Sequence, residues 1–343
     1  MIVWLNGRAL DYESGGCGFK SRYGRFLRDY FFIMTKIKCP YYADVLTPQT
    51  EKQLDESINK IREDFQEVGV DQFKIISRIG RGKFSQVFLG RDKDGQQFVL
   101  KTIPNCPDEF VAKEAQILSH LGVHRGVQEF IGAVKNPLKS VYTLVLRFYP
   151  ESNLEQLIPG LTQSSLKLYM KQLLESLDYV HSKGVIHRDV KPQNFLWNSE
   201  TKRGVLIDFG QSVFYRPQEE RSVVAGCRFF RAPELLLGYS HYHYGVDIWA
   251  AGIILASFMF QHFPLVKGSN NPEILLNLIE IFGSDELLKL SLKYNIGIPD
   301  EFQNLHFKRI PLEQSFLGER NQHLYSPEAI DLLTKMLSFD LQT

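Results

Sequence analysis

Short apolar runs of the kind found in β-strands fill the stretch between residues 72 and 147. These runs cover residues 73–76, 87–89, 98–100 and 141–146. A turn that carries glycines joins the first two runs, which is typical of an antiparallel pair. Between the third and fourth runs, Val111, Ala115 and Leu118 recur at helical spacing after Pro107-Asp108. The pattern predicts a small antiparallel sheet with one helix packed on it.

After Pro150 the apolar period changes to that of α-helices. The residues Leu166, Met170, Leu173, Leu174, Leu177 and Val180 keep a 3.6-residue period, and Gly184 supplies a stop. A further apolar helix is expected over 247–260, and Ser326-Pro327-Glu328 begins another. We therefore expect an α+β fold of two lobes within residues 71–343. The smaller, sheet-rich lobe covers 71–147 and the larger, mainly helical lobe covers 148–343.

The first residues do not follow either pattern. Residues 1–33 mix glycine, arginine, cysteine and aromatics without a period, and 9–25 resemble a transfer-RNA gene translated in error. The hypothesis is that Met34 is the true start and that 1–33 is an unstructured leader produced by the gene model. The alternative is a disordered or targeting extension, and the intact mass of the native protein separates the two. Residues 34–70 are expected to form an N-terminal arm.

Composition removes several classes of function. The chain has 40 basic and 39 acidic residues, a net charge of +1 and 44% apolar residues. This balance argues against a general nucleic-acid or membrane surface. The four cysteines, at 17, 39, 106 and 227, form no C-x-x-C pair and are expected to be reduced thiols. No apolar run approaches a membrane span and no secretory signal is evident, so an intracellular protein is expected.

Candidate chemistry is concentrated in residues 187–194, His-Arg-Asp-Val-Lys-Pro-Gln-Asn, followed by Asp208-Phe209-Gly210. Asp189 can accept the proton of an attacking hydroxyl, and Lys191 can lie on the transferring phosphate. Asn194 and Asp208 can bind Mg²⁺, which prefers a few such oxygens together with phosphate oxygens. The spacing therefore predicts phosphoryl transfer with ATP and Mg²⁺ as cofactors.

A nucleotide-binding set precedes that motif. The stretch 79–87, Ile-Gly-Arg-Gly-Lys-Phe-Ser-Gln-Val, allows backbone N–H groups to approach phosphates, although a glycine-rich hairpin alone would look similar. Lys101 is expected to hold phosphates rather than to be a solvated edge lysine, and Glu114 is preferred over Glu109 as its partner. The expected ATP-binding residues are Ile79, Gly80, Arg81, Gly82, Val87, Val99, Lys101, Glu114, Leu146 and Phe148.

Residues further along suggest a platform for a peptide. Ala232-Pro233-Glu234 closes the segment that follows Asp208, and Asp247 is expected to brace the catalytic loop. Arg228 and Arg231 are candidates for reading an acidic or phosphorylated substrate position. The alternative for these two arginines is structural pairing with glutamate side chains.

Together these motifs resemble a eukaryotic protein kinase, and Lys191 favours a serine/threonine enzyme. Over residues 40–343 the chain is most similar to the catalytic subunit of casein kinase II. The matching stretches are 42–45, 80–88, 178–184, 227–236 and 321–335. The second resemblance, carried by 194–196 and 204–210, is to the cell-division-cycle 7 kinase. The resemblance implies protein substrates, a regulatory subunit and a place in the nucleus or cytoplasm.

Several departures from casein kinase II change the expectation. Residues 105–110 carry acids where that family has lysines, so strict preference for acidic substrates is in doubt. Cys227 replaces a serine or threonine that steadies the catalytic aspartate, and Phe209 replaces a tryptophan. The chain stops at Thr343, before the arginine expected to pair with Glu234, so the C-lobe is expected to be truncated. A pseudokinase scaffold and a kinase of small molecules stay open as alternatives.

Overall fold

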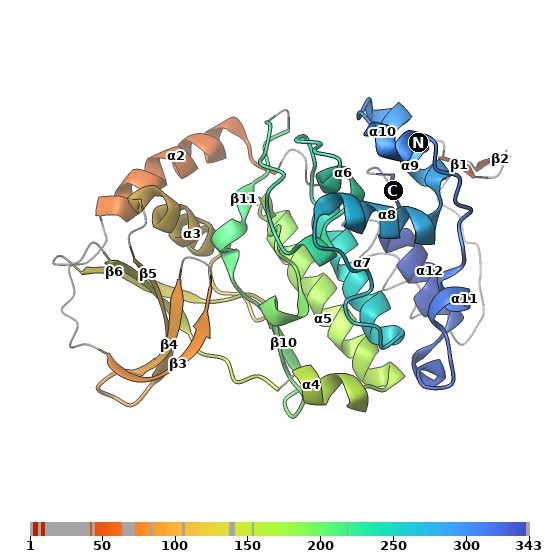
Figure 1. Ribbon diagram of the computed structural model, residues 1–343. Helices are drawn as coiled ribbons and strands as arrows, with labels where there is room; N and C mark the ends of the chain where they lie inside the picture. Colours follow the sequence, from red (N-terminus) through yellow and green to blue (C-terminus); the bar gives the residue numbers. More distant parts are fainter. Residues whose placement is uncertain are drawn as a thin grey trace.

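In a computed structural model of the chain, a β-sheet with two helices lies beside a larger set of helices (Figure 1). The structure describes residue 42 and residues 45–63, 73–82, 85–104, 107–136, 141–152, 154–217 and 219–340, together with the backbone of 3–5 and 8–10. This arrangement confirms the predicted α+β, two-lobed fold. The bulk of the predicted leader and of the arm before residue 42 lies outside the described residues. In the described part of the leader, β1 (Val3–Leu5) pairs with β2 (Arg8–Leu10).

The small lobe is built on one antiparallel sheet. Its strands are β3 (Lys74–Arg81), β4 (Gln86–Arg91), β5 (Gln97–Pro104), β6 (Phe130–Asn136) and β7 (Val141–Arg147). They lie in the order β3-β4-β5-β7-β6, so the last two strands exchange places relative to the sequence. Strand β6 was not predicted, because Gly132 interrupts its apolar run.

The pairing register decides which side chains share a face of the sheet. Val87 lies opposite Lys101, and Val99 lies opposite Leu146. Since side chains alternate along a strand, these four residues point to one face, toward the larger lobe. Phe98, Leu100 and Val145 form a separate small core on the other face.

One helix covers a side of this sheet, and a second helix packs on the first. Helix α3 (Asp108–Leu121) places Val111, Ala115 and Leu118 in the core, as predicted. Helix α2 (Pro48–Glu63) lies along α3 (Figure 1) and was not predicted. Its Leu54 is buried, and the buried Gln116 of α3 donates a 3.0 Å hydrogen bond from Nε2 to Ser57 Oγ.

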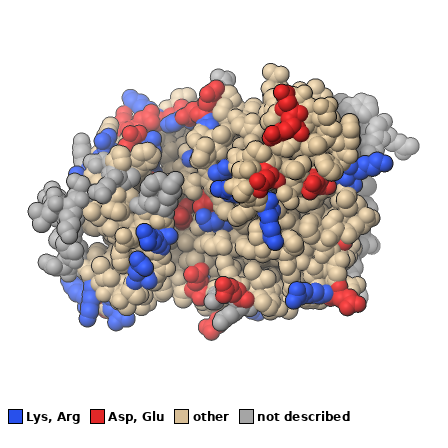
Figure 2. Space-filling model, in the orientation of Figure 1, with Lys and Arg blue, Asp and Glu red and all other residues tan. Residues whose placement is uncertain are grey.

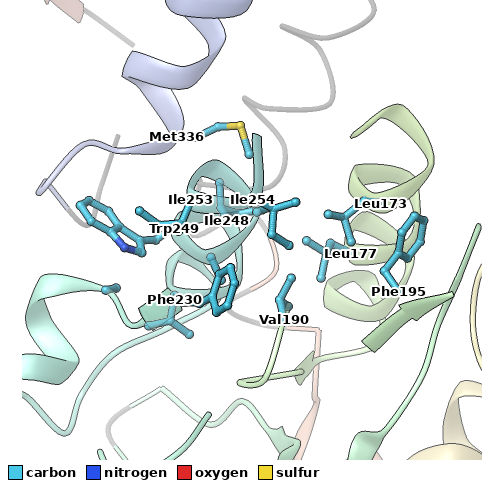
Figure 3. Close-up of a cluster of buried hydrophobic side chains, with 14 of the residues drawn as sticks. Leu173, Leu177, Val190, Phe195, Phe230, Ile248, Trp249, Ile253, Ile254 and Met336 are labelled. Atoms are coloured by element: carbon cyan, nitrogen blue, oxygen red, sulfur yellow. The ribbon is translucent and has the colours of Figure 1, made fainter. Parts of the chain in front are cut away.

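The larger lobe is organised around two apolar helices, α5 (Gln163–Ser182) and α7 (Gly245–Met259). Figure 3 shows Leu173 and Leu177 of α5 facing Ile254 of α7, with Met336 of α12 (Pro327–Met336) beside them. The remaining helices are α4 (Leu154–Leu157), α6 (Pro233–Leu236), α8 (Asn271–Phe282), α9 (Ser284–Tyr294), α10 (Asp300–Gln303) and α11 (Leu312–Phe316). Two short strand pairs complete the lobe: β8 (Val185–Ile186) with β11 (Val213–Phe214), and β9 (Phe195–Asn198) with β10 (Arg203–Leu206). This rigid core supports the loops that carry the candidate catalytic residues.

Candidate active site

Asp247 holds the catalytic loop by its backbone. The carboxylate is buried at the start of α7 and accepts from the N–H groups of His187 and Arg188, each at 2.8 Å. Its Oδ2 also lies 2.9 Å from His181 Nε2. Burial raises the pKa of Asp247, but the contacts with His181 and the loop amides lower it more, so the pKa lies below its ordinary range. The predicted bracing of the loop by Asp247 is confirmed.

The loop brings Asp189, Lys191 and Asn194 together. Lys191 Nζ donates to Asp189 Oδ2 at 2.6 Å, and Asn194 Nδ2 donates to the same oxygen at 2.9 Å. Asn194 Nδ2 also donates to the Asp189 carbonyl at 2.8 Å. Because the amide nitrogen of Asn194 is turned toward Asp189, its oxygen is directed elsewhere, and an amide oxygen is a ligand suited to Mg²⁺.

The carboxylate of Asp189 receives its third hydrogen bond from the backbone at Cys227. The Cys227 N–H donates to Asp189 Oδ1 at 3.0 Å. This bond comes from the main chain, so it forms whatever side chain residue 227 carries. Gly226 permits the approach: it has φ 68°, and a Cβ there would lie 2.3 Å from the Arg188 carbonyl oxygen.

Lys101 connects the two lobes through a pair of carboxylates. Its Nζ lies 2.8 Å from Glu114 Oε1 and 2.6 Å from Asp208 Oδ1. The expected contact between Lys101 and Glu114 is present, and Glu109 instead pairs with Lys113 at 3.0 Å. Lys101 therefore couples strand β5, helix α3 and the loop after β10.

Lys101 and Asp208 stabilise each other's charge, whereas burial raises the pKa of Glu114. Burial lowers the pKa of Lys101, but Glu114 and Asp208 raise it more, so the pKa lies above its ordinary value. For Asp208, burial raises the pKa and the Lys101 ammonium more than reverses the effect, which leaves the pKa below its ordinary range. Its side chain is still 43% exposed. A charged, accessible carboxylate at this place fits a divalent cation, and Asn194 with Asp208 are the residues that would hold it.

The glycine after Asp208 acts through its small size. The unusual backbone conformation belongs to Asp208 itself, which has φ 63°, rather than to Gly210. A Cβ on Gly210 would lie 3.2 Å from both Glu114 Oε2 and Lys101 Nζ. Gly210 therefore makes room for the charged cluster.

The sheet face that carries Lys101 also carries several of the other residues predicted to bind the nucleotide. Val87 and Lys101 lie side by side, Val99 lies opposite Leu146, and Phe148 follows directly after β7. Leu196 of β9 is a further candidate that the sequence analysis missed. Its neighbours Phe195 and Trp197 both pack on Tyr169 in the large lobe, so Leu196 points the other way.

The glycine-rich turn closes at Gly82, whose N–H donates to the Ser85 carbonyl at 2.8 Å. Gly80 lies opposite Val87, and Ile79 is exposed. Arg81 lies opposite Gln86, on the other face from Gly80, so its backbone rather than its side chain lies beside the cleft. The tip of this turn, residues 83 and 84, lies outside the described residues.

The two candidate substrate-reading arginines differ in their surroundings. Arg231 donates to the carbonyls of Ala225 and Gly226 and to Asn271 Oδ1, at 2.9–3.1 Å. Its partners are therefore loop carbonyls and an amide, and not the glutamates considered from the sequence. Arg228 is exposed at the edge of a cavity of about 510 Å³ that both arginines line. Reading of an acidic substrate stays a prediction for both, and Arg228 is the more accessible.

Two arginines tie the segment after Asp208 to its surroundings. Arg188 donates to the Gln211 carbonyl at 2.6 Å and to the Tyr242 hydroxyl at 2.9 Å. Arg216 forms ion pairs with Glu51 at 3.1 Å and with Asp55 at 3.4 Å, both on α2. Helix α2 therefore contacts both α3, which carries Glu114, and the segment that positions Cys227.

Replacing Arg216 by glutamate is expected to lower kcat/KM about threefold to tenfold. The change sets like charges against α2 at a partly exposed site, where each ion pair contributes about 0.2–1 kcal/mol. The double variant Arg216→Glu/Glu51→Arg is expected to recover most of the loss. Lys52→Glu, which breaks a pair on the solvent side of α2, is the matched control. Equal losses in Lys52→Glu and Arg216→Glu would remove any role for this contact.

The surface and the sequence match complete the description. Over the face drawn in Figure 2, cationic and anionic side chains are interspersed rather than gathered into one broad patch. Among the helices that the structure describes, none is long and apolar enough to span a membrane.

Residues 73–343 match the family model of the protein kinase domain. That match covers most of the chain and includes each of the residues assembled above, except those of α2. The chain therefore belongs to the protein kinase family.

Proposed function

We propose that this protein is a serine/threonine kinase of the casein kinase II type, which transfers the γ-phosphate of ATP, with Mg²⁺, to protein hydroxyls. The observation that carries the proposal is the assembled cluster of Lys101, Glu114 and Asp208 facing Asp189 and Lys191. In protein kinases a strand lysine paired with a helix glutamate and a metal-binding aspartate must both be in place for transfer. The distances of 2.8 Å from Lys101 to Glu114 and 2.6 Å from Lys101 to Asp208 support these roles.

Each residue of the cluster has a distinct part in the proposed reaction. Asp189, held by Asn194 and the Cys227 amide, would accept the proton of the attacking hydroxyl. Lys191, 2.6 Å from Asp189, would offset charge on the transferring phosphoryl group. Lys101 would hold the α- and β-phosphates. ATP would lie against the sheet face of Val87, Val99 and Leu146, and Asn194 with Asp208 would hold the Mg²⁺ that offsets the charge of its phosphates.

The choice of hydroxyl is tested by radioactive phosphate transfer from ATP–Mg²⁺ to matched peptides. Three peptides share an acidic sequence and differ only in a central serine, threonine or tyrosine, and a fourth places serine in a basic sequence. Transfer to serine and threonine, absent from an Asp208→Asn variant, is the expected result. Transfer to tyrosine at an equal rate would overturn the serine/threonine assignment. If folded protein transfers no phosphate to any peptide, the assignment as an enzyme is overturned.

Arg228→Glu is expected to lower kcat/KM for the acidic serine peptide about tenfold, or about 1.4 kcal/mol, and to spare the basic peptide. The reason is repulsion between the new carboxylate and an acidic substrate at an exposed position. Arg320→Glu, an exposed change elsewhere on the large lobe, is the matched control. A fall of the same size for both peptides would mean that Arg228 does not read substrate charge.

The casein kinase II assignment, a regulatory subunit, and a place in the nucleus or cytoplasm rest on sequence resemblance. The resemblance is supported where the 227–236 stretch forms the loop whose amide holds Asp189. The acids at 107–110 replace the lysines of that family, so any acidic preference would depend on cations elsewhere in the chain.

A further inference from the structure

A second groove lies away from the candidate active site, on the large lobe. It has a volume of about 300 Å³ and is bounded by α5, by the loop after α3 and by the turn between β9 and β10. Strand β10 runs beside α5 (Figure 1), which brings these three parts of the chain together. The charged side chains that line the groove are Arg125, Lys171, Glu175, Lys202 and Arg203.

Hydrogen bonds hold the walls of this groove in fixed positions. Gln172 on α5 bonds the turn twice: its Nε2 donates to the Lys202 carbonyl and its Oε1 accepts from the Gly204 N–H, both at 2.8 Å. On the opposite wall, the His124 ring stacks on Tyr179 with centroids 3.8 Å apart. The cations therefore project from a preorganised frame, which lowers the entropy lost on binding.

The groove carries far more positive than negative charge. Four cations surround one carboxylate, Glu175, which lies 3.6 Å from Arg125 and 3.7 Å from Lys171. Lys202 and Arg203 are exposed, and within the described residues neither forms an ion pair. In a chain whose net charge is only +1, such a local excess repels itself unless an anion offsets it.

We propose that this groove docks an acidic segment of the protein substrate, so that substrates are recruited by charge outside the cleft. The proposal rests on the kinase function proposed above. Guanidinium groups donate paired hydrogen bonds to carboxylates in a forked geometry, and clusters of such cations are a common means of recognising acidic motifs. An acidic peptide would place carboxylates against Lys202 and Arg203, while Arg125 and Lys171 are shared with Glu175.

The position of the groove sets a requirement on the substrate. Arg203 begins β10 and Asp208 follows five residues later. At about 3.3 Å per residue, Arg203 lies at most roughly 17 Å from Asp208. About five extended residues would span that distance, so an acidic segment about five residues or more from the phosphorylated residue can reach the groove. It is distinct from the site of Arg228, which would read a charge close to the phosphorylated residue.

Direct binding tests the docking site without any need for catalysis. The probe is a fluorescein-labelled peptide of glutamate and aspartate alone, titrated with the full chain in the absence of ATP and followed by anisotropy. Lys202→Glu/Arg203→Glu is expected to weaken the Kd at least about tenfold. Lys308→Glu/Arg320→Glu, which makes the same change of charge at exposed positions elsewhere on the large lobe, is expected to leave it unchanged.

Three outcomes would overturn the proposal: no binding by the wild type, equal weakening in both double variants, or weakening by Arg228→Glu alone. The third would place the peptide in the substrate cleft. If Lys202→Glu/Arg203→Glu does not fold, Arg125→Gln/Lys171→Gln gives the same test without altering the turn.

Kinetics add an independent measurement that separates docking from catalysis. A serine peptide that carries a distant acidic segment is expected to show a raised KM and an unchanged kcat with Lys202→Glu/Arg203→Glu. The same peptide without the segment is expected to show neither change. A protein that binds the peptide but transfers no phosphate would refute the proposed function and leave the docking proposal standing. An active enzyme whose KM does not depend on the acidic segment would refute the docking proposal and leave the proposed function standing.

Discussion

Asp208→Asn is expected to reduce phosphoryl transfer at least about a thousandfold, or about 4 kcal/mol of transition-state stabilisation. The amide has nearly the shape of the carboxylate, so the loop is expected to keep its position. It lacks the charge that binds Mg²⁺ and that faces Lys101 at 2.6 Å. Because the pKa of Asp208 lies below its ordinary range, the wild-type group stays charged at every pH above about 4, and the loss is expected to be the same from pH 6 to pH 9.

Single-turnover transfer from radioactive ATP measures this loss, and thermal unfolding shows whether the variant is folded. Asp285→Asn, a change of the same kind at an exposed position of α9, is the control and is expected to keep full activity. Activity of Asp208→Asn within tenfold of the wild type would show that Asp208 does not hold the metal.

Asp247→Ala is expected to destabilise the protein and also to lower its activity. The change removes the acceptor of two buried backbone N–H groups, at His187 and Arg188, and each such unsatisfied group costs about 1–3 kcal/mol. Freed from its brace, the catalytic loop would hold Asp189 less accurately, and a displacement of about 1 Å can cost about a hundredfold in rate. We expect kcat to fall about a hundredfold at temperatures where the variant is folded.

Comparison of Asp247→Asn with the wild type gives the pH dependence of this contribution. The folded pKa of Asp247 lies below its unfolded value, so its stabilising effect is complete above the ordinary aspartate pKa of about 3.9. It disappears as the pH falls from there through the folded pKa. The difference in unfolding free energy between the two proteins, measured in urea, is expected to be constant from pH 8 to pH 5 and to shrink below about pH 4. A difference that shrank between pH 8 and pH 6 would point to another titrating group.

The sequence predicts the catalytic loop well because its chemistry depends on neighbours in the chain. Asp189, Lys191 and Asn194 lie within six residues, so one loop brings them together. Lys101 and Glu114 could be paired from the strand and helix patterns around them. The Cys227 contact could not, because the donor is a backbone N–H and a sequence reports only side chains. The same limit hid the left-handed conformation of Asp208.

Helix α2 was missed although the sequence carries its signals. Thr47 accepts from the Thr50 N–H at 3.2 Å, and Pro48 occupies the first helical turn, as expected for a helix start. Leu54, Ile58 and Ile61 then follow at helical spacing. These residues lie in the N-terminal arm, and the helix there is stabilised by packing on α3 rather than by its own propensity.

The docking of α2 changes what counts as the working unit of this kinase. The family match begins at residue 73, after α2 has ended at Glu63. A fragment cut at that boundary would keep Lys101, Asp189 and Asp208, and it would still match the family model of the protein kinase domain. It would lack the helix that bonds α3 through Gln116 and the segment after Asp208 through Arg216. A boundary set by sequence similarity would therefore yield a protein that keeps every catalytic residue but loses the helix that supports α3 and the segment after Asp208.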